Sequence, residues 1–147
     1  MVPLVPVESA RRGIIEDLGK NGELEWVAVV NVPGEHLVAC RMPDASMEPA
    51  ISKGSIVVVD LGIQEIENGA YYLCDNTSHW PVRAMFVQDD MVIATCVDNK
   101  RAQPQVYHGS EMEMIQGKVV KVLVSDANPA NDPFKKKKND REKQKWV

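Results

Sequence analysis

The chain has 147 residues, of which 44% are hydrophobic, and a net charge of −4. This length and apolar content suit one globular domain with a single core. No apolar run approaches the roughly 18 residues that a membrane-spanning helix needs, and the N-terminus lacks the charged and then apolar order of a signal peptide. We therefore expect a cytoplasmic protein without a membrane segment.

The start of the chain is expected to be a lead-in rather than part of the main domain. Two prolines make residues 1–7 extended. Residues 8–20 have the composition of a short helix, which Gly13 weakens. We therefore assign residues 1–23 to an extended and helical lead-in. No segment before Glu25 is long enough for a helix-turn-helix, so any DNA-binding domain is expected on another chain.

Short apolar segments separated by turn residues follow from Glu25 onward. Turns are predicted at Pro33-Gly34, Asn76-Thr77-Ser78 and Asp89-Asp90. Seven short strands and little helix predict a mostly β fold, with a partly closed barrel-like sheet over residues 24–124. The expected strands are Glu25–Asn31, Leu37–Met42, Ser55–Asp60, Ala70–Cys74, Pro81–Val87, Met91–Cys96 and Met114–Val124.

The end of the chain differs from this domain in charge. Residues 134–147 carry seven Lys or Arg and two Asp or Glu, a net charge of +5, which leaves −9 on residues 1–133. We expect residues 125–147 to form a basic flexible tail in which Trp146 has no assigned role. Four consecutive lysines in it either stay solvated or contact nucleic-acid phosphates weakly. They are Lys135, Lys136, Lys137 and Lys138.

The three cysteines are odd in number and share no metal-ligand spacing. Cys40, Cys74 and Cys96 each stand among apolar or β-forming residues. We predict that they are buried free thiols. No metal site and no cofactor are expected.

The most informative stretch lies between two expected strands, from Met42 to Asp60. Pro43 and Pro49 stiffen it from both sides and Lys53-Gly54 turns the chain into the next strand. A serine held on such a loop, here Ser46, can be a nucleophile. The alternative is ordinary loop chemistry, in which Ser46 only starts a one-turn helix.

The motif Ser46-Met47-x-Pro49, followed by Gly54 and an apolar run that ends in Asp60, resembles the LexA-like (S24) peptidase domain. That family includes the SOS repressor, the phage repressors and UmuD, and it shares its partly closed β fold with signal peptidases. Further segments resemble the family in the same order along the chain. They are Val2-Pro3-Leu4-Val5, Asn68-Gly69-Ala70-Tyr71-Tyr72-Leu73, Cys96-Val97-Asp98-Asn99 and Ile115-Gln116-Gly117-Lys118-Val119-Val120.

The resemblance implies a serine nucleophile at Ser46, with Met47, Pro49 and Gly54 supporting its loop. Active relatives use a lysine on a later strand as general base, and Arg83 stands at that position here. Arginine stays protonated even when buried, so it cannot accept the serine proton. Relatives also cleave an Ala-Gly or Cys-Gly bond, and this chain has neither; Ala10-Arg11-Arg12-Gly13 lies near the expected place.

Loss of the base and loss of the target favour a regulatory and dimerisation domain of a phage-repressor-type transcriptional regulator, without self-cleavage. Two alternatives remain: an active, autoproteolytic serine peptidase and a stand-alone, UmuD-like accessory protein. A homodimer is expected, with an edge between Met112 and Val124 that includes Met114, Ile115 and Val119. The alternative for these apolar residues is that they belong to the core.

Overall fold

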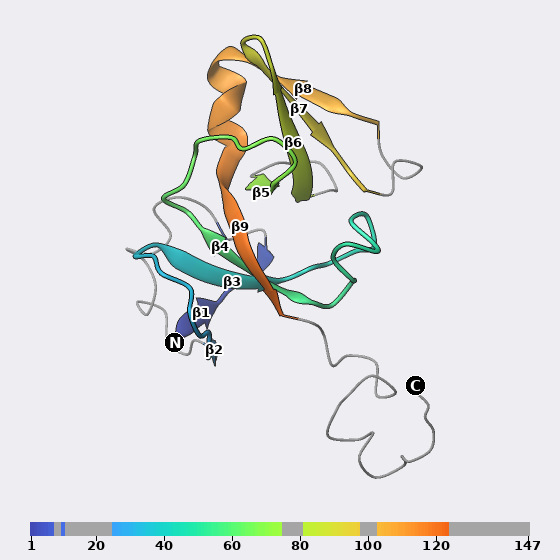
Figure 1. Cartoon of the computed structure of the whole chain (residues 1–147). Helices are drawn as coiled ribbons and strands as arrows, with labels where there is room; N and C mark the ends of the chain where they lie inside the picture. Colours follow the sequence, from blue (N-terminus) through green and yellow to red (C-terminus); the bar gives the residue numbers. More distant parts are fainter. Residues whose placement is uncertain (8–9, 11–24, 75–80, 98–102, 124–147) are drawn as a thin grey trace.

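The computed structural model describes residues 1–7, 10, 25–74, 81–97 and 103–123, and these residues form one sheet of nine strands (Figure 1). One short 3-10 helix, η2 (Gly109–Met114), precedes the last strand. The strands are β1 (Val2–Leu4), β2 (Glu25–Val27), β3 (Leu37–Arg41), β4 (Ile56–Asp60), β5 (Tyr71–Cys74), β6 (Val82–Gln88), β7 (Met91–Thr95), β8 (Gln105–Tyr107) and β9 (Ile115–Leu123).

The order of the strands in the sheet is β2-β1-β3-β4-β9-β5-β6-β7-β8. All neighbouring pairs are antiparallel except β1 and β3. The sheet does not close on itself, so β2 and β8 are its two edges within the described residues. The mostly β prediction is confirmed, with the sheet open rather than barrel-closed.

β9 joins the two halves of the sheet. Its first residues pair with β5, and Lys118 to Leu123 pair with β4. The two backbones approach so closely at Gly117 that a Cβ there would lie 2.5 Å from the carbonyl oxygen of Asp60. Only glycine fits at such a distance, which explains the glycine of the Ile-x-Gly sequence.

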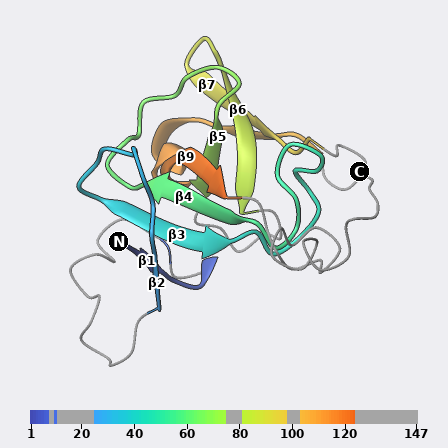
Figure 2. The ribbon, with the colours of Figure 1, turned by 60° about the horizontal axis from the view of Figure 1, so that its bottom comes forward.

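Buried side chains form two clusters on opposite faces of the β5–β6 pair, as expected from the alternation of side chains along a strand. The first, which we call the central cluster, includes Met42, Met47, Ile51, Val57, Leu73, Val82, Ala84 and Cys96. The second, the distal cluster, consists of Tyr72, Cys74, Met85, Val92, Ala94, Tyr107 and Ile115. Figure 2 shows the loop between β3 and β4 beside β6.

Most of the expected strands lie within a residue or two of those observed. The strand from Glu25 is shorter than expected, because it ends at Val27 and Asn31 adopts a positive φ of 62°. β8 and η2 were not predicted, and Met114 lies in η2 rather than in the last strand. The predicted turn at Asp89-Asp90 is present between β6 and β7. The expected helix at 8–20, the turn at 76–78 and the tail at 125–147 fall outside the described residues, apart from Ala10.

Candidate functional site

The loop that carries Ser46 is closed at its base by backbone hydrogen bonds between the ends of β3 and β4. The Met42 N–H donates to the Ser55 carbonyl at 2.7 Å, and the Gly54 N–H donates to the Met42 carbonyl at 2.8 Å. Gly54 has a φ of 87°, a left-handed conformation that favours glycine. The base of the loop is therefore fixed by the sheet and by one residue type.

Three apolar side chains of the same segment hold the loop against the sheet. Met42, Met47 and Ile51 are at most 1% exposed and belong to the central cluster, together with Val82 and Ala84 of β6. Between these anchors, Ser46 is fully buried. The Ser-Met-x-Pro motif thus places its serine over the beginning of β6.

The hydrogen bonds of Ser46 lead to Asp44 in its own loop. Asp44 Oδ1 accepts from the Ser46 N–H at 3.0 Å and from the Ser46 Oγ–H at 2.5 Å. This double contact is the geometry by which an aspartate stabilises a tight turn. The serine proton is therefore directed toward a carboxylate that also serves the loop backbone.

The other expected supporting residue, Pro49, follows a cis peptide bond after Glu48. Both residues are exposed, and Glu48 Oε2 accepts a hydrogen bond from the Lys53 N–H at 3.0 Å. The Glu48 side chain therefore stabilises the far side of the loop, although it is the variable position of the Ser-Met-x-Pro motif.

Arg83 is buried on β6, with 2% of its surface exposed. Its cross-strand partner is Tyr72, a member of the distal cluster, whereas its neighbours Val82 and Ala84 belong to the central cluster with Met47. Alternation along the strand therefore directs Arg83 to the face opposite Val82. Its Nη1 donates to Oε1 of Gln105 on β8.

Gln105 also links Arg83 to Tyr107. The Tyr107 hydroxyl donates to the same Gln105 Oε1 at 3.3 Å, so one amide oxygen receives two donors from β6 and β8. The hydrogen bonds described for Ser46 and for Arg83 thus lead to different partners, in the loop for the first and in β8 for the second. Sequence reasoning found neither Gln105 nor Tyr107, because no local pattern marks a residue two strands away.

The cysteines are buried and free, as predicted. Burial raises the pKa of Cys74 to about 12, although the nearby Arg83 charge and a hydrogen bond with Tyr107 lower it. A thiol with such a pKa stays protonated near neutral pH and is a poor nucleophile. Among the described residues, no group of three His, Cys, Asp or Glu is arranged to hold a metal ion. The described residues also contain no helix long and apolar enough to cross a membrane.

Comparison with protein-family models matches residues 3–120 to the Peptidase S24-like family. No curated protein matches the chain. The family match confirms the resemblance read from the Ser46 motif and the segments that follow it, and it runs from Pro3 of β1 to Val120 of β9. The chain therefore belongs to the Peptidase S24-like family.

Proposed function

We propose that this chain is a LexA-like regulatory and dimerisation domain that has lost self-cleavage. The observation that carries the proposal is the environment of Arg83, at the position where active relatives have their lysine. The guanidinium is buried and donates to Gln105, and an arginine has no lone pair available to accept a proton. The site consequently holds a serine without a general base at that position.

The hydrogen bonds of Ser46 support the same proposal. In an active serine site the hydroxyl donates to the base that will take its proton. Here Oγ donates to Asp44, whose Oδ1 also accepts from the Ser46 backbone. The serine therefore acts as a turn-stabilising residue, in line with the loop-chemistry alternative.

The test is the intact mass of the purified chain before and after long incubation at alkaline pH. High pH favours self-cleavage because it deprotonates the base. We expect a single unchanged mass. A pair of fragments that sum to the chain, present in the wild type and absent in Ser46→Ala, would show an active peptidase and reverse the proposal. Arg83→Lys in the same assay should also leave the mass unchanged, because the side chain at position 83 lies on the face of β6 opposite Val82 and Met47.

One observation favours the active peptidase as a second candidate. Ala10 is 3% exposed and belongs to the central cluster that also contains Met47, next to Ser46. A buried alanine upstream of the serine, in the same cluster as Met47, is what cleavage of the chain by its own serine would require. If the alkaline incubation yields fragments, this candidate requires the new C-terminus to be Ala10.

Dimerisation is the second element of the proposal, and β9 is the strand we assign to it. Ile115 and Met112 pack with the distal cluster, so this part of the expected edge is core. Val119 to Leu123 are only partly buried, and in the described part of the chain no strand pairs with the β5 side of β9 beyond Lys118. An open strand edge of this kind is a site for pairing with a second copy.

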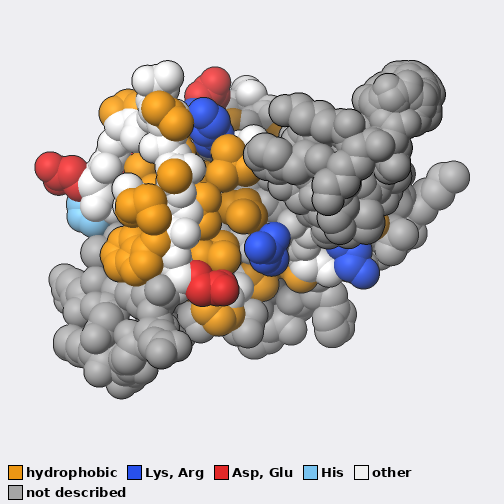
Figure 3. Space-filling view, turned by 90° about the horizontal axis from the view of Figure 1, so that it is seen from below, with side chains coloured by type: hydrophobic (Ala, Val, Ile, Leu, Met, Phe, Trp, Pro, Cys, Tyr) orange, Lys and Arg blue, Asp and Glu red, His pale blue; other side chains and the backbone are white. Residues whose placement is uncertain are grey.

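The end of the molecule to which β9 runs also carries exposed apolar surface. Hydrophobic side chains gather on this face around a few charged ones (Figure 3). Trp26 on the edge strand β2 is 50% exposed and Val30 is 66% exposed.

Sedimentation at high micromolar concentration tests the dimer: we expect twice the monomer mass, with Val120→Lys giving a monomer. A wild type that sediments as a monomer would refute it.

A further inference from the structure

An exposed apolar row crosses three neighbouring strands at the distal end of the sheet. Phe86 of β6, Ile93 of β7 and Val106 of β8 are register partners, so their side chains lie side by side on one face. Phe86 is 42% exposed, Val106 is 44% exposed and Ile93 is partly exposed. We call these three residues the apolar row.

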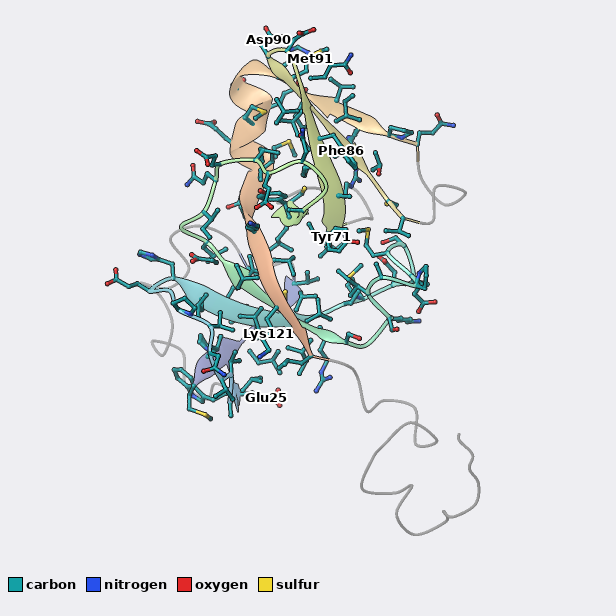
Figure 4. The ribbon with its side chains drawn as sticks, viewed as in Figure 1. Glu25, Tyr71, Phe86, Asp90, Met91 and Lys121 are labelled. Carbon is teal, nitrogen blue, oxygen red and sulfur yellow. The ribbon has the colours of Figure 1, made fainter. Side chains whose placement is uncertain are left out.

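The apolar row continues the face that the Ser46 loop covers. Val82, Ala84 and Phe86 alternate onto the same side of β6, and the first two are buried in the central cluster with Met47. Figure 4 shows the labelled residues Tyr71, Phe86 and Met91 in succession from the β3–β4 loop toward the distal turn. Within the described residues, the cover ends between Met85 and Phe86, where the burial of β6 changes from buried to exposed.

Two acidic side chains stand at the end of the hairpin that carries this row. Asp89 and Asp90 form the turn that follows β6, and both are exposed. Glu65 and Glu67 lie toward the other face, because the Tyr72 hydroxyl donates to the Glu65 carbonyl and Glu67 pairs with Lys118, the register partner of Tyr72. The surface thus fits an occupant with an apolar side chain next to positive charges.

The sequence of this chain contains such a segment. Residues 134–138, which we call the basic segment, read Phe-Lys-Lys-Lys-Lys. The aromatic side chain of this segment suits the apolar row, and the four lysines that follow it suit the two aspartates of the neighbouring turn. We propose that the basic segment of the same chain docks on the apolar row, with Phe134 on Phe86, Ile93 and Val106 and its lysines beside the acidic turn.

The length of the chain permits this contact. Eleven residues lead from Leu123, the end of β9, to Phe134, and when extended they span up to about 36 Å. β9 has nine residues, or about 30 Å, and runs from the distal end to the opposite end of the sheet (Figure 1). The basic segment can therefore return along the full length of β9 to the apolar row.

Tethering makes the contact intramolecular, so it does not weaken on dilution as pairing with a second copy does. The linker must be nearly extended to reach the row, so the effective concentration lies well below the millimolar value of a linker whose length matches the span. The ion pairs would lie at the surface, so each is weak and is screened by salt. The docked state should consequently depend on both Phe134 and ionic strength.

The experiment uses the full chain with a nitroxide spin label at Asn139→Cys. The three native cysteines are buried, so the label attaches to the added thiol. We expect the amide signals of Phe86, Ile93 and Val106 to lose about half of their intensity or more at low salt, relative to Glu25–Val27 at the other end of the sheet. Phe86→Ser and high salt should each restore them by about twofold. The matched control is Trp26→Ser, an exposed aromatic residue outside the row.

Three results would overturn the proposal. The first is equal broadening at both ends of the sheet. The second is broadening at the row that Phe86→Ser leaves unchanged or that Trp26→Ser also removes. The third comes from mixing isotope-labelled chain without nitroxide and unlabelled chain with nitroxide: broadening at the row in that mixture assigns the occupant to a second copy.

Discussion

The two halves of β6 show how much of the local structure is set by what covers a strand. Val82 to Met85 are buried, whereas Phe86 to Gln88 are exposed; Val82 to Ala84 pair with β5, and Ala84 to Gln88 pair with β7. Val82 and Val87 are the same residue type on one strand, with exposures of 0% and 44%, and they lie on opposite faces of it. On the face of Val82, Val82 and Ala84 share the central cluster with Met47 of the Ser46 loop, whereas Phe86 lies outside that cluster.

The two halves of β6 therefore have different roles. In the covered half, the family motif supplies core side chains, and Ser46 is held among them. In the exposed half, apolar side chains contribute little to the core and remain available for binding. Substitutions in the first half should therefore lower the stability of the fold, and substitutions in the second half should affect binding.

The largest expected effect is the protection of the thiols in the covered region. Cys74 and Cys96 are 4% exposed, and burial raises the pKa of Cys74 to about 12. Because modification requires the fold to open, we expect reaction with a thiol reagent at pH 8 to be at least about 10³-fold slower in the native protein than in denaturant. The measurement is the rate at which the protein thiols react with the reagent, followed by absorbance.

The raised pKa of Cys74 also has a consequence for stability at alkaline pH. The folded protein keeps this thiol protonated, while an unfolded thiol ionises near pH 8.5. Its contribution to stability is therefore complete below that pH and is lost as the pH rises toward about 12. Rapid modification of all three cysteines in the native protein would contradict their burial in the central and distal clusters.

The next effect is the loss of the side chain that joins the loop to the sheet. Met47 is fully buried in the central cluster, and Met47→Ala leaves a cavity there. We expect this variant to lower the free energy of unfolding by about 2–5 kcal/mol, as measured by urea denaturation. A loss below about 0.5 kcal/mol would mean that the loop does not depend on its apolar anchor.

The two valines of β6 give the most direct test of the comparison. Val82→Ala should cost about 2 kcal/mol, because it removes buried methyl groups from the central cluster. Val87→Ala should cost within about 0.5 kcal/mol of zero after allowance for strand propensity. Both replacements change strand propensity alike, so the difference in urea midpoints measures the burial of the two positions. Equal losses would contradict the division of β6.

These same residues show what could be predicted from the sequence. The Ser-Met-x-Pro motif predicted the loop, the following strand and its apolar anchors, because turn residues and apolar runs act locally. Gly117 was found as part of a motif, but its reason, the approach of Asp60, is visible only in the structure. Alternation along β6 accounts for the face of Arg83, opposite Val82.

The partners of Arg83 and Ser46 could not be predicted in the same way. Gln105 lies on β8, 22 residues from Arg83, and a three-residue edge strand gives no periodic signal. Asp44 stands two residues before Ser46, and this spacing was a usable signal, since an aspartate there can accept the serine N–H. The exposure of Phe86 also depends on which loop lies over β6. The alternation of residues along the strand does not predict the position of that loop.

The smallest expected effect concerns the ion pair at the border of the exposed half. Lys118 Nζ lies 2.6 Å from Glu67 Oε1, and this hydrogen bond lowers the pKa of Glu67 and raises that of Lys118. A carboxylate with a lowered pKa stabilises the fold above its unfolded pKa, and that contribution is lost as the pH falls through the folded value. Because Glu67 is exposed, solvent screens most of the interaction. Glu67→Gln should lower the melting temperature at pH 7 by no more than about 2 °C, and the difference from wild type should vanish in acid and in high salt. A difference that persists below the folded pKa of Glu67 would assign the effect to packing of the side chain rather than to its charge, and would make this border part of the covered half.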